Sequence, residues 1–110
     1  MRLSTTAEWM TFCQQNMGKM ILIDFTSEGC GLCRMMARSM RAIRERYANR
    51  VAFAQIDMDD AIRSGWEWAR VQGLPAFRLF RWDGDRHRMV EEWPGSNIET
   101  VENRLKRYVE

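Results

Sequence analysis

The sequence predicts an α/β fold, with a central mixed sheet of four to five strands flanked by helices on both faces. Two observations carry this prediction. Apolar runs of strand length alternate with segments of helical periodicity over about the first 70 residues, which favours parallel strands joined by helical crossovers. Two later strand-like runs follow one another across a short turn, which favours antiparallel pairing. Because a chain of 110 residues has room for one core, we expect a single domain over residues 1–110.

The first helix and the first long strand are predicted near the N-terminus. Thr5 and Glu8 have the spacing of a capping box, and apolar residues then recur at helical spacing, so we expect a helix from about Thr6 to Asn16. Gly18 ends this helix. The run Met20 to Phe25 is short and rich in isoleucine, which is typical of a strand buried on both faces.

Two further helices and one strand follow. The segment from Cys33 to about Ala48 carries an apolar stripe and predicts a long second helix. Val51 to Asp57 alternates in a way that predicts a strand, and Asp59 to Val71 predicts a third helix. The apolar stripe of this third helix consists of Ile62, Trp66 and Ala69.

The C-terminal third predicts a hairpin and a last helix. Gly73-Leu74-Pro75 forms a turn before a strand at Ala76 to Trp82, and Asp83-Gly84-Asp85 connects it to a second strand near His87 to Glu92. A capping box at Ser96 to Glu99 then begins a helix with one apolar side. The resulting order is βαβαββα after an initial helix.

Composition narrows the class of protein. The formal net charge is only +2, which does not favour nucleic acid or a membrane surface as a partner. No apolar stretch reaches the roughly 20 residues of a transmembrane helix, and the N-terminus lacks the pattern of a secretory leader. Three cysteines, two of them close together, suit a reducing compartment, so we expect a cytoplasmic protein.

The most informative pattern is Cys30-Gly31-Leu32-Cys33, which lies between a predicted strand and a predicted helix. Unpaired N–H groups and the positive dipole end of the helix favour a thiolate at Cys30, which would act as the nucleophile. Cys33, one turn further on, could then attack the mixed disulfide formed by Cys30. This pattern predicts a redox dithiol.

The cysteines and the histidine also have other interpretations. Cys30 and Cys33 could be half of a zinc site or an inert disulfide, but zinc needs about four ligands and only Cys13 and His87 remain as candidates. We therefore expect no metal. Cys13 is expected to be a packing residue, and His87 a solvated residue on the hairpin.

Asp24 interrupts the apolar run of the first long strand. It could be a solvated carboxylate at the strand end. Alternatively, burial between Ile23 and Phe25 would raise its pKa, so that it could accept and return the proton of Cys33 during exchange.

Several landmarks in order resemble the thioredoxin family, from Leu3 to the end of the chain. Ile21 to Phe25 is similar to the family's central strand with its buried aspartate, and Cys30 to Cys33 occupies the position of its active-site motif. Arg34 to Ala37 resembles the start of the second helix. Gly73-Leu74-Pro75 resembles the loop whose cis-proline faces the dithiol. The resemblance implies a thioredoxin fold.

The chain also departs from the family pattern. Tryptophan before the first cysteine and proline between the pair are replaced by Gly29 and Leu32. Gly29 should leave Cys30 more exposed, and Leu32 supplies an N–H that could hydrogen-bond its thiolate and make the dithiol more oxidising. Phe53 stands where a lysine often neighbours the aspartate, which would deepen its desolvation.

The resemblance implies a thiol–disulfide oxidoreductase that reduces protein disulfides and needs no cofactor. Cys30, Cys33 and Asp24 would be catalytic. The substrate-binding residues would be Gly29, Gly31, Leu32, Leu74 and Pro75. Disulfide-containing proteins would be the substrates, and a thioredoxin reductase or another thiol reductant would resupply electrons. The alternatives are a weakly active or inactive module that docks one protein partner, and an iron–sulfur cluster shared by two copies through Cys30.

Overall fold

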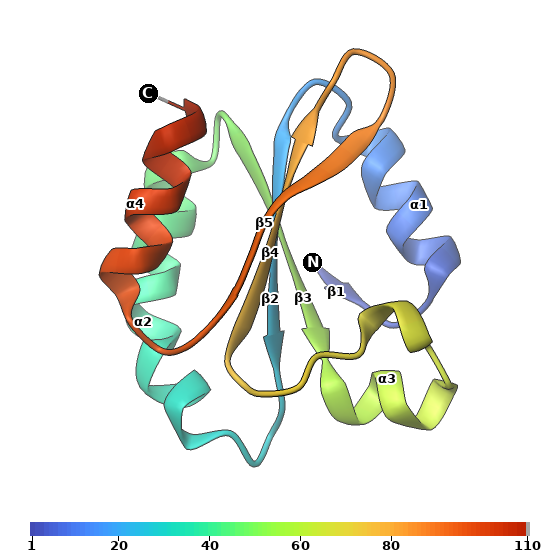
Figure 1. Ribbon diagram of the computed structural model, residues 1–110, viewed down its shortest axis with the longest axis vertical. Helices are drawn as coiled ribbons and strands as arrows, with labels where there is room; N and C mark the ends of the chain where they lie inside the picture. Colours follow the sequence, from blue (N-terminus) through green and yellow to red (C-terminus); the bar gives the residue numbers. More distant parts are fainter. Residues whose placement is uncertain (110) are drawn as a thin grey trace.

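The computed structural model describes residues 1–109, which form a five-stranded mixed sheet with helices on both faces (Figure 1). The elements in chain order are β1 (Arg2–Leu3), α1 (Thr6–Gln15), β2 (Met20–Thr26), α2 (Gly31–Tyr47), β3 (Val51–Asp57), α3 (Met58–Ser64), the 3₁₀ turn η1 (Glu67–Ala69), β4 (Ala76–Trp82), β5 (His87–Pro94) and α4 (Ile98–Val109). The predicted fold class is confirmed.

The strand order in the sheet is β1-β3-β2-β4-β5. β3 runs parallel to β1 and β2, whereas β4 is antiparallel to both β2 and β5. β2 is therefore the central strand. The connection into α2, the start of α2 and the segment leading into β4 all lie at one end of the sheet, the lower end in Figure 1.

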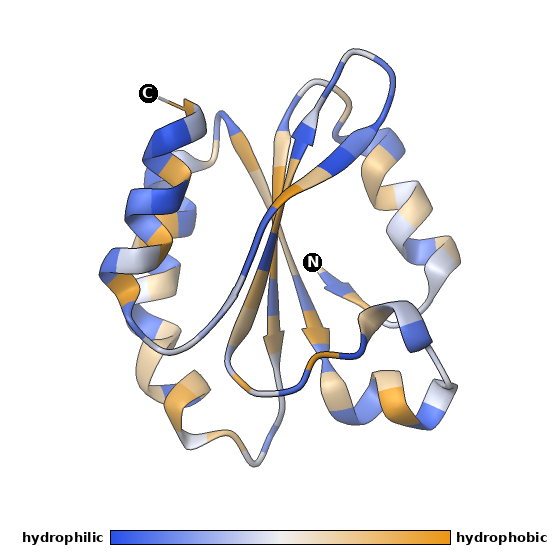
Figure 2. Cartoon of the chain, viewed as in Figure 1, coloured by the Kyte–Doolittle hydropathy of each residue, from blue (hydrophilic) through white to orange (hydrophobic). Residues whose placement is uncertain are grey.

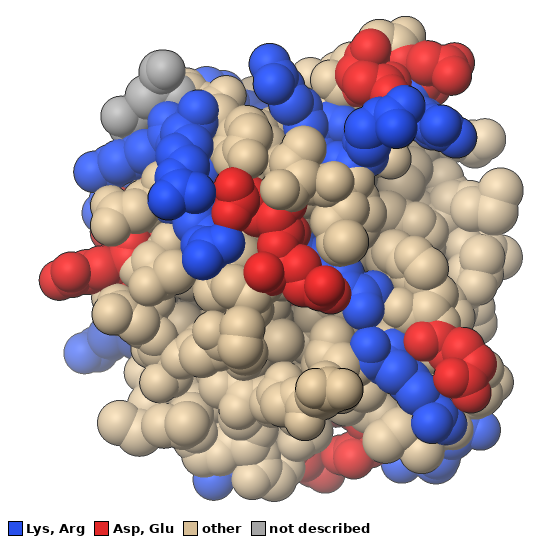
Figure 3. Space-filling model, viewed as in Figure 1, with Lys and Arg blue, Asp and Glu red and all other residues tan. Residues whose placement is uncertain are grey.

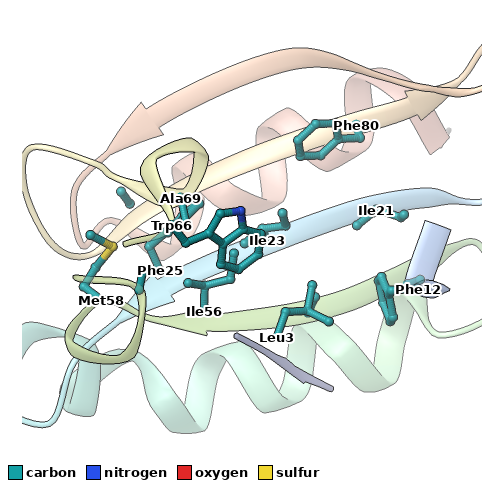
Figure 4. Packing of buried hydrophobic residues seen from close by; sticks show 14 residues of the cluster. Leu3, Phe12, Ile21, Ile23, Phe25, Ile56, Met58, Trp66, Ala69 and Phe80 are labelled. Carbon is teal, nitrogen blue, oxygen red and sulfur yellow. The ribbon is translucent and has the colours of Figure 1, made fainter. Parts of the chain in front are cut away.

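Each face of the sheet packs against its own helices. One core cluster joins β2 and β3 to α1, α3 and η1, and Figure 4 shows its members, with Trp66, Phe25 and Ile56 at its centre. The other cluster joins the opposite face to α2 and α4. In Figure 2 the strands β2 and β3 are mostly apolar, whereas β5 and the helices carry both apolar and polar residues. This two-sided burial explains the continuous apolar run of β2.

Several helices begin with a residue whose side chain accepts a hydrogen bond from a backbone N–H of the first turn. Thr5 Oγ1 accepts a hydrogen bond from the N–H of Glu8 at 3.1 Å, as the predicted capping box requires. At the start of α4 the cap differs from the prediction. Asn97 Oδ1 accepts from the N–H of Glu99 at 2.9 Å, so Asn97 and not Ser96 supplies the bond.

Two elements differ from the sequence prediction. The short strand β1 was not predicted, and it pairs with β3 through Leu3 and Ile56. The predicted third helix is shorter, because Gly65 adopts φ +70°, a left-handed conformation that ends α3. The stripe prediction fails at Ile62, which is 55% exposed, while Trp66 and Ala69 are buried.

Charged side chains of both signs are interspersed on the face shown in Figure 3, and the lower left of this face is largely uncharged. Within residues 1–109, none of the helices is both long enough and apolar enough to cross a membrane.

Candidate active site

The junction between β2 and α2 carries the two cysteines. The chain turns after Thr26, and the N–H of Cys30 donates to the carbonyl of Ser27 at 3.1 Å. Cys30 has extended backbone angles and is the N-cap of α2, which begins at Gly31. The sulfur of Cys30 therefore lies beside the first turn of α2, where backbone N–H groups have no partner within the helix.

Cys30 and Cys33 form a disulfide with their Cα atoms 5.3 Å apart. The N–H of Cys33 donates to Cys30 Sγ at 3.1 Å. The donor to Cys30 Sγ is thus the N–H of Cys33, one residue beyond the predicted donor, Leu32. This donor is aimed at the sulfur on which negative charge would develop when the disulfide opens, and it would stabilise a thiolate there.

A groove of about 490 Å³ opens beside Cys30. Its lining comes from three segments: the active-site turn, α3 and the segment before β4. The lining residues are Ser27, Gly29, Cys30, Gly31, Leu32, Met58, Asp59, Ile62, Val71, Gln72, Gly73 and Leu74. Of the two cysteines, only Cys30 contributes to this lining. An incoming disulfide bond in the groove would therefore meet Cys30 first.

The groove brings together four of the five residues that were predicted to bind substrate. Leu32 is 48% exposed at its rim, and a Cβ placed on Gly29 would meet open space. The Leu74–Pro75 peptide bond is cis, as the family resemblance implied. Pro75 itself is buried behind the groove, where its carbonyl accepts a hydrogen bond from the N–H of Gly95 at 2.9 Å.

Two apolar residues of the opposite wall, Ile62 and Val71, were not predicted as part of the site. Ile62 on α3 was expected in the core, and Val71 was expected at the end of a helix. One feature of the sequence could have indicated this role of Ile62: Gly65 can end the helix, which leaves Ile62 on a short helix after β3. An apolar exposed side chain on such a helix can contact a partner.

Asp24 lies on the sheet face that α2 covers, in register with Gln55 on β3 and Phe77 on β4. It borders a partly open cavity of about 250 Å³ together with Arg44 and Phe53. Burial raises the pKa of Asp24 from 3.8 to about 6, against a smaller opposing effect of the Arg44 guanidinium. Asp24 is thus a half-buried carboxyl that titrates close to neutrality, and not a solvated strand end.

Arg44 was not predicted to act near Asp24. Phe53 does line the cavity, but the cation that partly compensates the carboxylate comes from helix α2 instead of β3. Arg44 follows the buried Met40 by one helical turn, which places it at the edge of the face that packs on the sheet. Helical spacing alone could not say which strand residue it faces.

The remaining cysteine and the histidine lie away from the groove. Cys13 packs against the core cluster, as predicted, and burial raises its pKa to about 11. His87 is not solvated as expected. It is half-buried, its Nε2 lies 2.9 Å from the carbonyl oxygen of Lys19, and its ring meets Trp82 edge to face. Among residues 1–109, no group of three or more His, Cys, Asp or Glu side chains could hold a metal ion.

Known proteins share both the sequence pattern and the fold. The family model for thioredoxin matches residues 1–105. A thioredoxin of Coprinus comatus is 32% identical over 93 residues, covering 84% of this chain and 83% of that protein. The human thioredoxin is 30% identical over 91 residues, covering 83% of this chain and 81% of that protein.

Solved structures agree with this assignment. The thioredoxin of Fasciola hepatica superposes with a TM-score of 0.83 at 26% identity, covering 97% of each chain. A thioredoxin f2, solved in complex with ferredoxin:thioredoxin reductase, shares the fold at a TM-score of 0.80 and 17% identity, covering 96% of this chain and 91% of that one. With its Cys30–Cys33 pair joined at the start of α2, the chain belongs to the thioredoxin family and is a thiol–disulfide oxidoreductase.

Proposed function

We propose that this protein reduces disulfides of partner proteins in two exchange steps. The Cys30 thiolate attacks one sulfur of the substrate disulfide, forms a mixed disulfide and releases the other substrate sulfur as a thiolate. The Cys33 thiolate then attacks Cys30 Sγ. The substrate leaves as a dithiol, two electrons have passed to it, and the Cys30–Cys33 disulfide remains.

One observation carries this order of attack. Cys30 lines the groove and Cys33 does not, so a bulky substrate reaches the first sulfur and not the second. The hydrogen bond from the N–H of Cys33 to Cys30 Sγ supports the same assignment, because it stabilises negative charge on Cys30 when Cys30 is the nucleophile or the leaving group.

Asp24 acts as the proton acceptor for Cys33 in this proposal. The Cys33 thiol must lose its proton before it can resolve the mixed disulfide. A carboxyl with a pKa of about 6 is largely ionised at neutral pH, yet basic enough to accept that proton, directly or through water in the adjoining cavity. Asp24 lies under α2, the helix that carries Cys33.

The groove binds an extended segment of substrate on either side of its disulfide. Gly29, Gly31 and Leu32 form one wall beside Cys30, and Leu74 faces them from the segment before β4. Pro75 holds that segment from behind. The absence of a side chain at Gly29 leaves room for a substrate residue, and the exposed Leu32 supplies apolar contact area.

Electrons for the next cycle come from a thioredoxin reductase or another thiol reductant. The structural likeness to a thioredoxin f2 solved with its reductase supports docking of such a donor on the same groove. We place the protein in a reducing compartment, the cytoplasm, where one close dithiol and the free Cys13 suit catalysis better than structural bridging. It acts as one domain over residues 1–110.

Reduction of insulin, with dithiothreitol as electron donor, tests the proposal. The wild-type protein should accelerate precipitation of the free insulin chain, and Cys30→Ser should fall to the uncatalysed rate. Cys13→Ser is the matched control and should match the wild type, because Cys13 lies outside the groove. A Cys30→Ser variant that reduced insulin as fast as the wild type would overturn the proposal.

A further inference from the structure

Arg78 is a charged residue in the middle of β4, on the sheet face that packs against the core cluster of α1, α3 and η1. Its neighbours on this face, Ala76 and Phe80, belong to the buried core cluster, and the Arg78 side chain is only 11% exposed. A guanidinium in such a position is costly unless its donors are paired. No sequence pattern predicts an arginine at this point in a covered strand.

Each guanidinium nitrogen of Arg78 has an acceptor. Nε donates to Glu92 Oε2 on the neighbouring strand at 2.7 Å. The other two nitrogens donate to main-chain carbonyls, one to Trp68 at 2.6 Å and one to Arg70 at 3.1 Å. Carbon Cζ also lies 5.1 Å from the centre of the Trp68 ring, in range of a cation–π contact.

The two carbonyls that Arg78 binds belong to η1 and the residue after it, at the start of the segment that forms one wall of the groove. Val71 to Leu74 lines the groove opposite Cys30. At the far end of this segment, Pro75 is held by the N–H of Gly95. Among the described residues, no backbone–backbone hydrogen bond from a turn or loop involves 71–74. Val71 and Leu74 also pack against the core cluster, so the hydrogen bonds that hold the wall lie at its two ends, whereas apolar contacts support it in between.

We infer that Arg78 is a positioning residue for substrate binding: through the carbonyls of Trp68 and Arg70 it sets where the wall Val71–Leu74 stands relative to Cys30. The inference rests on the proposed function, because it assigns the wall to substrate binding. Arg78 touches neither sulfur. Its loss should therefore weaken the binding of large substrates and leave the exchange chemistry at Cys30 intact.

Replacing Arg78 with methionine tests this, since methionine keeps an apolar side chain about as long as the Arg78 stem up to Nε but has no donors. We expect KM for insulin to rise about tenfold, with kcat within about twofold of the wild type. Turnover of a small aromatic disulfide, which needs no long groove, should stay within about twofold.

A second readout does not depend on activity. Backbone ¹⁵N order parameters for Val71 to Leu74 should fall in Arg78→Met, because one end of the segment is released. Arg81→Met is the matched control: Arg81 is exposed on the same strand, and its loss should change neither KM nor the order parameters. Arg78→Lys keeps the charge beside Glu92 but cannot span both carbonyls, so it should give an intermediate rise in KM.

The outcomes separate this inference from the proposed function. Unchanged order parameters and an unchanged KM in Arg78→Met would overturn the inference, even if the wild type reduces insulin. Equal losses for insulin and the small disulfide, with KM constant, would also overturn it, since they indicate a general effect on the fold or on Cys30. If Arg78→Met does not fold, KM for insulin, turnover of the small disulfide and the order parameters of Val71 to Leu74 are compared between Arg78→Lys and the wild type instead. A wild type that fails to reduce insulin would instead refute the proposed function.

Discussion

Replacing Asp24 with asparagine should stabilise the oxidised protein in a pH-dependent way. Burial raises the pKa of Asp24 from 3.8 to about 6, so the folded protein resists ionisation of this carboxyl more than the unfolded chain does. At about 1.4 kcal/mol for each unit of pKa, this rise corresponds to about 3 kcal/mol. Asparagine has nearly the same shape and never ionises, so it removes that cost.

The sign follows from the direction of the rise. Below about pH 3 Asp24 is protonated in both the folded and the unfolded chain, so the variant and the wild type should be about equally stable. Between about pH 4 and pH 6 the unfolded chain loses this proton first, and the stability of the wild type falls relative to that of the variant. The advantage of Asp24→Asn should reach about 3 kcal/mol by pH 7 to 8.

Urea unfolding of both oxidised proteins at pH 4, 6 and 8 measures this difference in free energy. Asp85→Asn, at an exposed hairpin carboxylate, is the matched control and should show no comparable gain. The variant should also slow the resolving step, which is seen as slower release of substrate from the mixed disulfide. If the variant and the wild type differ in stability by the same amount at pH 4 and pH 8, or if the variant is less stable at pH 8, Asp24 is not a buried carboxyl with a raised pKa.

Three further changes probe the surroundings of the site and the fold. Arg44→Gln removes a cation that lowers the pKa of Asp24, so NMR titration should place that pKa above about 6. Arg41→Gln, at an exposed position on the same helix, should leave the pKa of Asp24 unchanged. An unchanged pKa of Asp24 in Arg44→Gln would contradict the effect of the Arg44 guanidinium. Gly65→Ala should lose about 1 kcal/mol in urea unfolding, because alanine is strained at φ +70°, and an unchanged stability would count against the left-handed end of α3. Hydrogen bonds from backbone N–H groups of the hairpin and from a nearby arginine hold the pKa of Asp83 at about 2. Asp83→Asn should therefore be less stable than the wild type near pH 6, and this gap should shrink as pH falls from 4 toward 2; a gap of constant size would be inconsistent with that low pKa.

The long-range order of the fold was predictable because local patterns and a family resemblance agreed. The run Met20 to Phe25, the helical stripe after Cys33 and the turn at Asp83-Gly84-Asp85 each specify one element by spacing alone. β1 was missed because it has two residues, too few for periodicity to register, and exists only through pairing with β3. The end of α3 was missed because the apolar spacing at Ile62, Trp66 and Ala69 continues past Gly65 into a 3₁₀ turn that is no longer α-helical.

The chemistry of the dithiol was predictable, but its supporting contacts were not. Cys30 and Cys33 lie close in sequence, so a strand followed by a helix was enough to place them. The contact of Arg44 with the Asp24 cavity and the three acceptors of Arg78 join residues on different elements. Side-chain reach across elements depends on packing, which spacing within one helix or strand does not specify.

His87 illustrates the same limit. Its charged neighbours in the sequence predicted a solvated ring, but the strand pairing of β4 and β5 places the ring edge-on to Trp82 and brings Nε2 within reach of the carbonyls of Asn16 and Lys19. The turn after α1 is distant in sequence from the hairpin, so the residues that flank His87 in the sequence could not predict its contact with that turn.

Trapping of the mixed disulfide tests most directly whether Cys30 attacks and Cys33 resolves. Each reduced single variant, Cys33→Ser and Cys30→Ser, is mixed with a peptide that contains one disulfide, and mass spectrometry locates the adduct. We predict a long-lived adduct on Cys30 in Cys33→Ser and little adduct on Cys33 in Cys30→Ser, because Cys30 alone lines the groove. Equal or faster capture by Cys33 would contradict the account.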